Sequence, residues 1–371
     1  MRSSELRRLE VAIVAPTLGI LGGQAVQADR LLRAWAGDPD LHAWLVPVNP
    51  TPPPPLKYLL PFTGLRTIVT QLTYWPLLLR RLRYADVVHV FSASYLSFLL
   101  APLPAVLISR LLGKAVVMNY RSGEAPDHLH RSAIARAVLR SVDHNVVPST
   151  FLQRIFAGFD IRADVIPNIV DLERFAFRLR RPLRPHLVST RNFEPLYNVA
   201  CTLNAFALVQ QKHPGATLTL VGAGSQDAAL RRLVADRGLR NVRFTGRVRP
   251  EEIWRYYADA DIYVQTPDID NMPASILEAF ASGCAVVSTE AGGVPDILTH
   301  ERHGLLAPCG DHAAIAAHVC RLLDDPELAE RLTAQARAGC EGYRWTSVRK
   351  DWLSLYRALA QNGALPQPTT T

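Results

Sequence analysis

Short apolar runs rich in β-branched residues alternate with longer helical stretches along the first half of the chain. Runs of this kind, bounded by turn residues, predict strands that are buried on both faces. Between them, stretches such as Gln24–Ala36 carry apolar residues at helical spacing. Strands that alternate with helices predict βαβ units and a parallel sheet. The predicted strands of this half are 11–16, 43–48, 87–91, 115–120 and 144–148.

The same pattern starts again after FRLRRPLRPH (177–186), a basic stretch with two prolines that is typical of an interdomain linker. The predicted strands of the second half are 187–190, 217–222, 242–246, 261–265 and 285–289. We therefore predict an α/β protein with two Rossmann-like, doubly wound parallel-sheet domains that face a cleft. The predicted bounds are 1–180 and 181–345, and 371 residues also favour two domains over one. Residues 346–371 are predicted to form a helix that crosses back to the first domain, followed by a frayed tail.

Positive charge is concentrated in the first half of the chain. Residues 1–183 hold 22 Lys and Arg against 13 Asp and Glu, whereas the whole chain has a net charge of +8. This excess fits an anionic partner, such as a membrane surface, a phosphorylated substrate or nucleic acid. An Arg-rich surface that only keeps the protein soluble explains it equally well. Because no RNP-like, zinc-finger or basic-zipper pattern is present, we predict no nucleic-acid partner.

The five cysteines indicate neither a disulfide framework nor a zinc site. They all lie in the second half, are odd in number and include no Cys-x-x-Cys pair. The N-terminus leads into the first predicted strand without a long apolar signal region. Both observations favour a reducing cytoplasm.

The segment Tyr95–Gly113 is the most apolar stretch of the chain, but Pro102, Pro104 and Arg110 interrupt it. A membrane-spanning helix needs about 20 apolar residues without such breaks. We predict a buried helix-turn-helix instead. Shallow contact with an anionic membrane, helped by LLLRRLRY (77–84), remains an alternative.

Two glycine-rich loops and one acidic triplet are weak indications of a ligand site. Gly22 and Gly23 lie between a predicted strand and a helix, where backbone N–H groups approach phosphates. LVGAGSQ (220–226) lacks the third glycine of a dinucleotide fingerprint, so a nicotinamide cofactor is not expected. Asp268 and Asp270 form an Asp-x-Asp triplet, but magnesium usually needs substrate phosphates as well, and we predict no metal.

The stretch TPDIDNMPASILEAFASG (266–283) predicts a loop that opens a helix. Asp270 lies in the loop, Glu278 lies in the first half of the helix, and Gly283 ends it. The N–H groups at the helix start can hold an anion, while the two acids can bind hydroxyl groups. A capping Asp and a half-buried Glu without a ligand are an equally good explanation of these residues alone.

The motifs of the second half resemble those of the retaining glycosyltransferases of family 4, which have the GT-B fold. That family carries Glu-x7-Glu, which corresponds to Asp270-x7-Glu278. Its pattern EAxAxGxPVVxTxxGGxPE corresponds to EAFASGCAVVSTEAGGVPD (278–296), and the resemblance extends from about Ser189 to Asp325. In the first half it is sparser and rests on ADVVHVF (85–91), VIPNIVDLERF (165–175) and the Gly22–Gly23 pair.

The resemblance implies a transferase that moves a hexose from a nucleotide sugar, UDP-linked rather than GDP-linked, to a hydroxyl of a glycan or lipid-linked acceptor, as in cell-envelope polysaccharide biosynthesis. It implies no other cofactor. Asp270 would contact the donor sugar, Glu278 the ribose and Arg191 the diphosphate. The residues implied at the donor are Gly22, Gly23, Arg191, Gly222, Gly224, Gly246, Arg247, Asp270, Asn271, Met272, Pro273, Ser275 and Glu278, and the catalytic residues are Asp270, Arg121 and Arg191.

Three positions depart from the family pattern. Asp270 is one methylene shorter than the usual Glu, Leu196 stands where a lysine is usual, and Arg121 stands at the register of a histidine. Arg121 is a candidate for stabilising the charge of the leaving phosphate. The alternatives are a non-catalytic nucleotide-sugar-binding module and a sugar phosphorylase or epimerase on the same fold.

Overall fold

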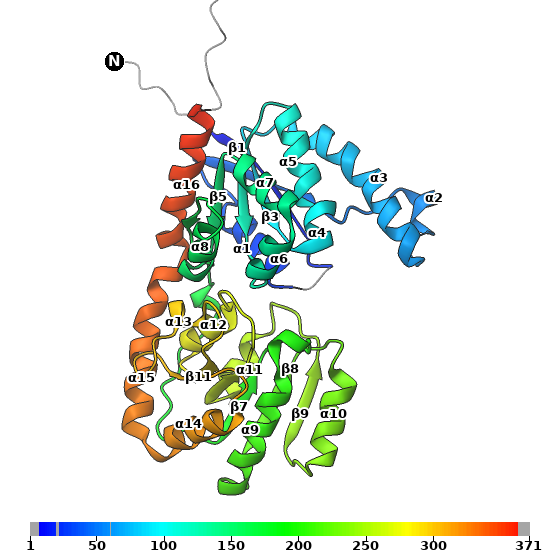
Figure 1. The fold of residues 1–371 in the computed structure, drawn as a ribbon. Coiled ribbons are helices and arrows are strands. Elements are labelled where there is room, and N and C mark those ends of the chain that lie inside the picture. Colours follow the sequence, from blue (N-terminus) through cyan, green and yellow to red (C-terminus); the bar gives the residue numbers. More distant parts are fainter. Residues whose placement is uncertain (1–6, 20–21, 60, 363–371) are drawn as a thin grey trace, which may run out of the picture. The chain divides into compact units, whose positions relative to one another are not determined.

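The computed structural model describes residues 7–19, 22–59 and 61–362, and they form two units. Unit 1 runs to Ile169 and resumes at Val348, whereas unit 2 is Val170–Ser347. The chain therefore passes between the units at 169/170, about ten residues before the predicted boundary at 180/181. Residues from Val348 onward, which lie in the predicted third segment, belong to unit 1. Each unit has helices on both sides of its sheet (Figure 1).

Unit 1 is built on a six-stranded parallel sheet with the order β2-β1-β3-β4-β5-β6. This is a doubly wound order. The chain adds β2 on one side of β1 and the later strands on the other side, so the winding reverses between β1 and β3. Its strands are β1 (Leu9–Ala15), β2 (Leu41–Pro47), β3 (Val87–Ser92), β4 (Ala115–Tyr120), β5 (His144–Val147) and β6 (Asp164–Val165). Its helices are α1 (Gly23–Ala34), α2 (Pro54–Lys57), α3 (Thr63–Leu82), α4 (Tyr95–Leu100), α5 (Pro102–Leu111), α6 (Ala125–Arg131), α7 (Ala133–Ser141), α8 (Thr150–Ala157) and the C-terminal α16 (Trp345–Asn362).

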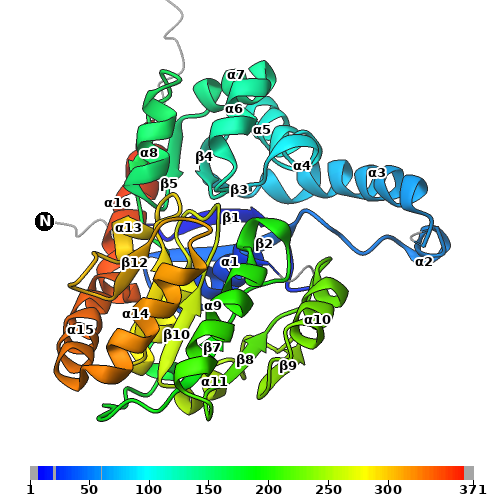
Figure 2. The same cartoon turned by 60° about the horizontal axis from the view of Figure 1, so that its bottom comes forward.

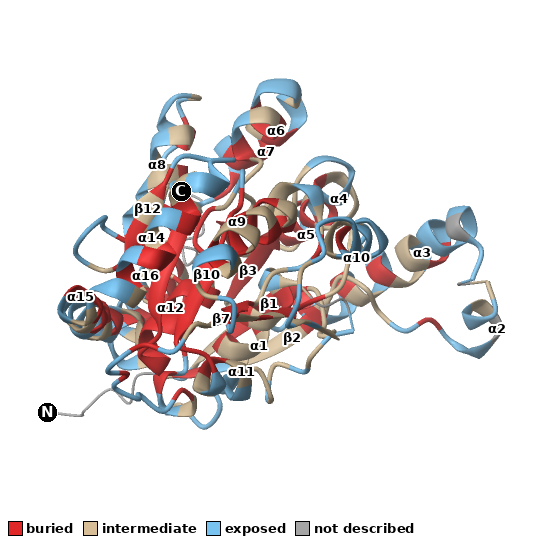
Figure 3. Ribbon diagram, turned by 90° about the horizontal axis from the view of Figure 1, so that it is seen from below, coloured by how far each residue is buried: buried red, intermediate tan, exposed pale blue. Residues whose placement is uncertain are grey.

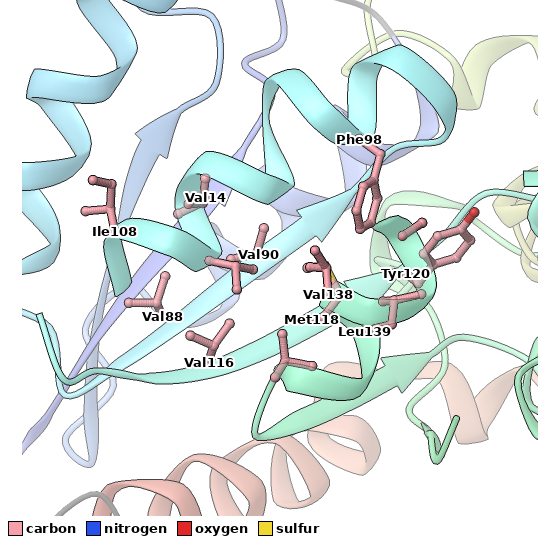
Figure 4. Packing of buried hydrophobic residues seen from close by; sticks show 14 of the residues in the cluster. Val14, Val88, Val90, Phe98, Ile108, Val116, Met118, Tyr120, Val138 and Leu139 are labelled. Carbon is pink, nitrogen blue, oxygen red and sulfur yellow. The ribbon is translucent and has the colours of Figure 1, made fainter. Parts of the chain in front are cut away.

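Alternate strand residues of unit 1 face opposite sides of the sheet. Val88, Val90, Val116 and Met118 pack into one buried cluster with Phe98 from α4 (Figure 4). The residues between them face the other side, where the His89 ring stacks on Trp352 of α16 at a centroid distance of 4.6 Å. Both faces are covered, which explains why the strands read as continuous apolar runs.

Unit 2 contains a second six-stranded parallel sheet with the order β12-β11-β10-β7-β8-β9. The first and fourth strands of this unit, β7 and β10, are therefore neighbours, and the winding reverses between them. The strands are β7 (His186–Ser189), β8 (Thr217–Val221), β9 (Val242–Gly246), β10 (Ile262–Gln265), β11 (Ala285–Thr289) and β12 (Leu305–Ala307). The helices are α9 (Val199–Lys212), α10 (Asp227–Asp236), α11 (Trp254–Asp259), α12 (Ala274–Ser282), α13 (Val294–Ile297), α14 (His312–Asp324) and α15 (Pro326–Gly339), with 3₁₀ turns η1 (Leu172–Arg174), η2 (Pro195–Tyr197) and η3 (Cys340–Tyr343).

Two cores flank the sheet of unit 2. Leu187 and Val287 face one core, together with residues of α9 and α14, while Val188 and Val286 face the other. The second core includes most of α12, whose residues from Ser275 to Ser282 are all buried. Figure 3 accordingly shows α12 in the colour of buried residues. This burial holds the helix rigidly behind the loop that precedes it.

Ten of the twelve strands coincide with predicted runs, within one or two residues at each end. The two that were not predicted, β6 and β12, have only two and three residues, too few for a pattern to emerge. The stretch 177–186 was predicted to be a linker, and this is wrong because it packs on unit 2. Its Arg180 is buried and donates hydrogen bonds to the backbone carbonyls of Ala260, Tyr257 and Ser282.

The segment Tyr95–Gly113 forms two helices, α4 and α5, as predicted, but it is only partly buried, since Tyr95, Leu96, Leu107 and Leu111 are exposed. Within the described residues, none of the helices combines the length and the apolar character needed to cross a bilayer.

Candidate functional site

The candidate site lies at the carboxyl ends of the strands of unit 2, where β7 and β10 lie side by side. The loop after β7 carries Arg191, and the loop after β10 carries Asp270. The Arg191 Nη2 atom donates a hydrogen bond to Asp270 Oδ2 at 2.5 Å. Ligands of doubly wound sheets bind where the winding reverses, because the loops diverge there. Arg191 and Asp270 therefore flank the position at which this fold binds ligands.

Three groups fix the guanidinium of Arg191. Besides Asp270, the Ser275 hydroxyl accepts a hydrogen bond from Nη1 at 3.2 Å, and the Tyr197 ring lies 4.0 Å from Cζ. Burial alone lowers the pKa of Arg191, but the Asp270 carboxylate and the neighbouring tyrosines raise this pKa above its ordinary value. Each Nη atom carries two hydrogens, and these contacts use one on each. Arg191 is thus a fixed, permanently charged donor.

The Asp270 carboxylate is held from two directions. While Oδ2 accepts from Arg191, Oδ1 accepts from the backbone N–H of Asn271 at 2.8 Å. The Asp270 carbonyl also accepts from the N–H of Gly293 at 3.2 Å. The N–H of Asn271, which the sequence predicted to face the donor, is therefore committed to a protein acceptor in this structure. Met272, the next residue, is buried in the unit 2 core.

Pro273 occupies the N-cap position of α12, and Ala274 is the first helical residue. A proline has no N–H to donate, and no side chain caps this helix end. The N–H groups of the first turn therefore retain the positive partial charge of a helix N-terminus. Ser275 belongs to this turn and contacts Arg191, which places cation and helix end together.

A buried polar network lies beneath Ser275. Its hydroxyl donates to Gln265 Oε1 at 3.3 Å, and the same oxygen accepts from the Tyr263 hydroxyl at 3.0 Å. The Gln265 amide in turn donates to Ser288 Oγ at 3.1 Å. Burial raises the pKa of Tyr263 to about 12, so that its hydroxyl stays protonated and able to donate. The network fixes the position of Ser275 from below.

Glu278 lies three residues after Ser275, on the same face of α12. Its Oε2 atom accepts a hydrogen bond from the Tyr257 hydroxyl at 3.0 Å. The hydroxyl of Thr190 lies 2.6 Å from the same Tyr257 oxygen. Because Tyr257 gives its single proton to Glu278, Thr190 must be the donor to Tyr257. Burial, followed by the Glu278 charge, raises the pKa of Tyr257 well above its ordinary value, so this donor is present at all physiological pH values.

The glycine loops of unit 2 approach the loop that carries Arg191. A Cβ atom on Gly222 would lie 2.1 Å from the Arg191 carbonyl oxygen, and one on Gly224 would lie 2.4 Å from the Phe193 carbonyl oxygen. These two glycines are required by close backbone contact. A Cβ atom on Gly246 would meet nothing within 4 Å, but the φ of this residue is +71°, which favours glycine. Arg247 follows it on the surface and is exposed.

Among the described residues, no three or more His, Cys, Asp or Glu side chains are gathered as they would be to hold a metal ion, and this includes the surroundings of Asp268 and Asp270. The Asn198 amide donates to both oxygens of Asp268 at 3.1 Å, while Asp270 is paired with Arg191. The two carboxylates therefore have separate partners. Leu196 contributes only its carbonyl oxygen, which accepts from the N–H of Asp268 at 3.0 Å.

Three predicted residues lie in unit 1 and not in this cluster. Gly22 is the N-cap of α1 and Gly23 its first residue, and a Cβ on either would meet nothing within 4 Å. Arg121 follows β4 and lines a small pocket with Gln27, Phe91, Asn168 and Trp352. Its Nη1 atom donates to Asn119 Oδ1 at 3.4 Å. Burial lowers the pKa of Arg121 to about 9, which leaves it charged at neutral pH.

Two family models match consecutive parts of the chain. The family model described as Glycosyltransferase Family 4 matches residues 21–174, and the model described as Glycosyl transferases group 1 matches residues 174–339. The chain belongs to the family 4 glycosyltransferases. All the site residues of unit 2 lie within the second match.

Curated relatives of this glycosyltransferase family include enzymes named for the transfer of different sugars. The chain is 27% identical to the sulfoquinovosyl transferase SQD2 of Arabidopsis thaliana over 297 residues, which are 72% of this chain and 56% of SQD2. It is also 27% identical to a GDP-mannose-dependent alpha-(1-6)-phosphatidylinositol monomannoside mannosyltransferase of Mycobacterium tuberculosis over 252 residues, 61% of this chain and 64% of that one. The chain spans between about half and two-thirds of the length of these relatives.

Solved structures of glycosyltransferases share the fold. HepE of Anabaena, crystallised in complex with UDP-glucose, superposes with a TM-score of 0.75 over 95% of this chain and 100% of HepE, at 16% identity. At this identity the likeness concerns the fold alone. The predicted GT-B fold class is confirmed.

Sequence reasoning missed the residues that support the family's acids. Tyr257, Thr190, Tyr197 and Gln265 hold Glu278, Arg191 and Ser275 in place. The one available signal was Gln265, a polar residue at the end of an otherwise apolar strand. The aromatic residues resemble ordinary core residues in sequence, and only their hydroxyl contacts distinguish them.

Proposed function

We propose that this protein is a retaining glycosyltransferase that moves a sugar from a nucleotide-sugar donor to a hydroxyl acceptor and releases a nucleoside diphosphate. The observation that carries this proposal is the pairing of Arg191 with Asp270 beside the open N-terminus of α12, with Glu278 one turn further along. A cation, a helix end and two carboxylates together suit a ligand with a diphosphate between two polyols.

Each part of the donor has a proposed partner in unit 2. Glu278 accepts hydrogen bonds from the ribose hydroxyls, and Tyr257 keeps its carboxylate in place. Arg191 and the first turn of α12 bind the diphosphate. Asp270 accepts from hydroxyl groups of the transferred sugar. Because Gly222 and Gly224 have no side chain, their loop packs directly against the backbone of the loop that carries Arg191, which leaves room for the nucleotide.

The proposed reaction needs neither a protein nucleophile nor a metal ion. The acceptor oxygen forms a bond to the anomeric carbon on the face from which the diphosphate departs, and the bond between that carbon and the phosphate oxygen breaks. The acceptor proton passes to the departing phosphate oxygen. Negative charge grows on the diphosphate in the transition state, where a fixed donor such as Arg191 contributes about 10²–10³-fold in rate.

The nucleobase of the donor and the identity of the acceptor are proposed from less direct observations. HepE was solved with UDP-glucose, which supports a UDP-sugar, whereas the mycobacterial relative uses GDP-mannose. We propose a UDP-sugar and a glycan or lipid-linked acceptor, with the reaction on the cytoplasmic side. Arg121 and the Gly22–Gly23 turn lie in unit 1, and their roles toward the donor stay predictions.

The proposal is tested by adding UDP-glucose, other UDP-sugars and GDP-mannose to the full chain. Calorimetry measures binding, and proton NMR follows the anomeric configuration of any product or hydrolysed sugar. The sugar that is first released should have the same anomeric configuration as the donor. Asp270→Asn should abolish this release, whereas Asp268→Asn should preserve it. Absence of binding by every nucleotide sugar at millimolar concentration contradicts the proposal.

A non-catalytic nucleotide-sugar-binding module is the second candidate. It is favoured by Leu196 and Arg121, which replace the lysine and histidine usual in the family. A module of this kind binds UDP-sugars in the same calorimetric experiment but never converts them, and Asp270→Asn leaves that binding unchanged.

A further inference from the structure

Helix α3 exposes a continuous apolar stripe on the surface of unit 1. Leu65, Ile68, Leu72, Trp75 and Leu79, here called the α3 stripe, have exposed fractions of 44%, 56%, 62%, 39% and 42%. Their spacing alternates between three and four residues. At 100° per residue this spacing places all five within an arc of about 80°. Large apolar side chains that gather in this way on an exposed face indicate a binding surface.

The face of α3 that adjoins the stripe is already used for packing. Tyr74, Leu78 and Leu82 are fully buried in the unit 1 core. The Tyr74 hydroxyl donates to the Ala101 carbonyl at 3.0 Å, and the Gln71 amide donates to the Leu100 carbonyl at 3.0 Å. These contacts fix the rotation of the helix. The α3 stripe therefore cannot turn inward without breaking the core contacts.

The segment that contains the stripe is positively charged. Between Asp40 and Asp86 the sequence contains no Asp or Glu. The same interval holds five basic residues, all of them exposed, namely Lys57, Arg66, Arg80, Arg81 and Arg83. At 100° per residue, Arg83 lies level with the edge of the stripe and Arg80 about 60° beyond that edge, so basic side chains border the apolar face on one side. An apolar face with such a border is complementary to a surface that is apolar inside and anionic at its edge.

Aromatic residues lie at both ends of the helix. Tyr58 and Phe62, just before α3, are exposed by 79% and 61%, and Tyr84, just after it, by 60%. The Arg83 guanidinium lies 4.5 Å from the Tyr84 ring centre. Tyrosine and arginine are suited to the boundary between lipid headgroups and acyl chains, because each has an apolar body and a polar end.

In Figures 1 and 2, α3 and α2 extend away from the sheet of unit 1, and Figure 3 colours the end of α3 that carries α2 as exposed or intermediate. A 20-residue helix is about 30 Å long and can lie flat on a bilayer. Its exposed side is thus accessible to a flat partner over most of its length.

We propose that the α3 stripe docks unit 1 onto a bilayer that contains anionic lipids, with α3 parallel to the membrane plane. A second copy of the chain is disfavoured as the occupant, because a stripe paired with its own copy brings the basic residues of both copies together. This docking does not depend on the proposed transferase activity. If the acceptor is lipid-linked, docking also brings the protein to it.

The test uses the full chain and sedimentation with two kinds of vesicle, one of phosphatidylcholine alone and one with equal phosphatidylglycerol and phosphatidylcholine. The protein is expected to sediment with the anionic vesicles and to be released in 1 M salt. Leu72→Glu should weaken the partition at least tenfold, because it replaces an inserted apolar side chain by a charge that the lipids repel. Arg80→Glu and Arg83→Glu should each weaken it about fivefold or more.

The matched control is Leu179→Glu in unit 2, where the leucine is exposed by 53% and lies outside the α3 stripe. It should sediment like the unaltered protein. Circular dichroism of each variant verifies that α3 and the rest of the chain stay folded. Because sedimentation does not require turnover, this result is separate from the test of the proposed function.

Three outcomes overturn the proposal. The first is no sedimentation with anionic vesicles, and the second is equal sedimentation of Leu72→Glu and the unaltered chain. The third is self-association of the unaltered chain in analytical ultracentrifugation that Leu72→Glu abolishes while neither form binds vesicles. That third result assigns the stripe to a dimer interface.

Discussion

Arg191 and Asp270 form an ion pair of 2.5 Å across the point where the winding of the unit 2 sheet reverses. Their side chains are exposed by only 10% and 12%, so the pair is weakly screened by water. The residues are 79 positions apart in sequence, and the neighbouring positions of β7 and β10 bring them together. The pair couples the proposed sugar-side acid to the proposed diphosphate-side cation.

Replacing either member of this pair should have opposite effects on UDP binding. Arg191→Lys loses the planar, two-pronged donor and should weaken UDP at least tenfold. Asp270→Asn removes a negative charge beside the diphosphate position and should bind UDP as tightly as the unaltered protein or more tightly, while transfer falls at least 100-fold. Calorimetry and a transfer assay measure the two quantities. Asp268→Asn is the matched control, since Asp268 is held by Asn198. If Arg191→Lys and Asp270→Asn weaken UDP binding equally, Asp270 acts on the nucleotide and not on the sugar.

Glu278→Gln should weaken UDP about tenfold to 100-fold through the loss of charged hydrogen bonds to the ribose. The sharper measurement compares UDP with 2′,3′-dideoxy-UDP. The unaltered protein should prefer UDP strongly, and Glu278→Gln should lose most of that preference. Tyr257→Phe, which removes the donor to Glu278, should lose about fivefold to tenfold in UDP affinity and keep part of the preference. An unchanged preference in Glu278→Gln contradicts the ribose assignment.

Gly222→Ala should destabilise unit 2 and abolish UDP binding. The added methyl group would lie 2.1 Å from a backbone oxygen of Arg191, and backbone atoms cannot move aside as a side chain does. We expect a loss of about 1–3 kcal/mol in unfolding free energy, measured by thermal melting. Gly215→Ala is the control, since a Cβ there meets nothing within 4 Å. A stable Gly222→Ala variant that binds UDP normally would contradict the close approach of these loops.

Acid should loosen the contact between β3 and α16 in unit 1. Burial, with a smaller contribution from Arg121, lowers the pKa of His89 to about 3. The ring accepts from the Asn119 amide at 3.0 Å and lies 2.6 Å from the Tyr356 hydroxyl, an arrangement that suits neutral histidine. Between pH 6.5 and pH 3 the unfolded chain therefore binds a proton that the folded chain does not. Stability falls by about 2 kcal/mol from pH 7 to pH 5.

Hydrogen exchange of β3 and α16 measures this effect, corrected for the intrinsic dependence of exchange on pH. In His89→Gln the pH-dependent part should disappear, even if the variant is less stable overall. An equal pH dependence in His89→Gln would assign the effect to another group.

Much of the fold follows from local pattern. Most of the ten predicted strands are visible as apolar runs because they are buried on both faces, and a strand such as β10 has no exposed position to interrupt its pattern. The edge strands β2 and β9 are the exceptions, since they include exposed positions. The short strands β6 and β12 carry too few residues to show it. The units meet at 169/170 and not at the predicted 180/181, because the stretch between them packs on unit 2, where Arg180 is buried against three backbone carbonyls.

The sequence by itself determined the elements, the glycine loops and the acidic pair on either side of a helix start, since these depend on spacing within one segment. Only the tertiary structure decided that Arg191 meets Asp270, that Tyr257 supports Glu278 and that the α3 stripe faces outward. The physical reason is the same in each case. Apolar spacing specifies that a helix has an apolar face but not which neighbour covers it, and strand order, set by packing of the whole unit, selects which loops become partners.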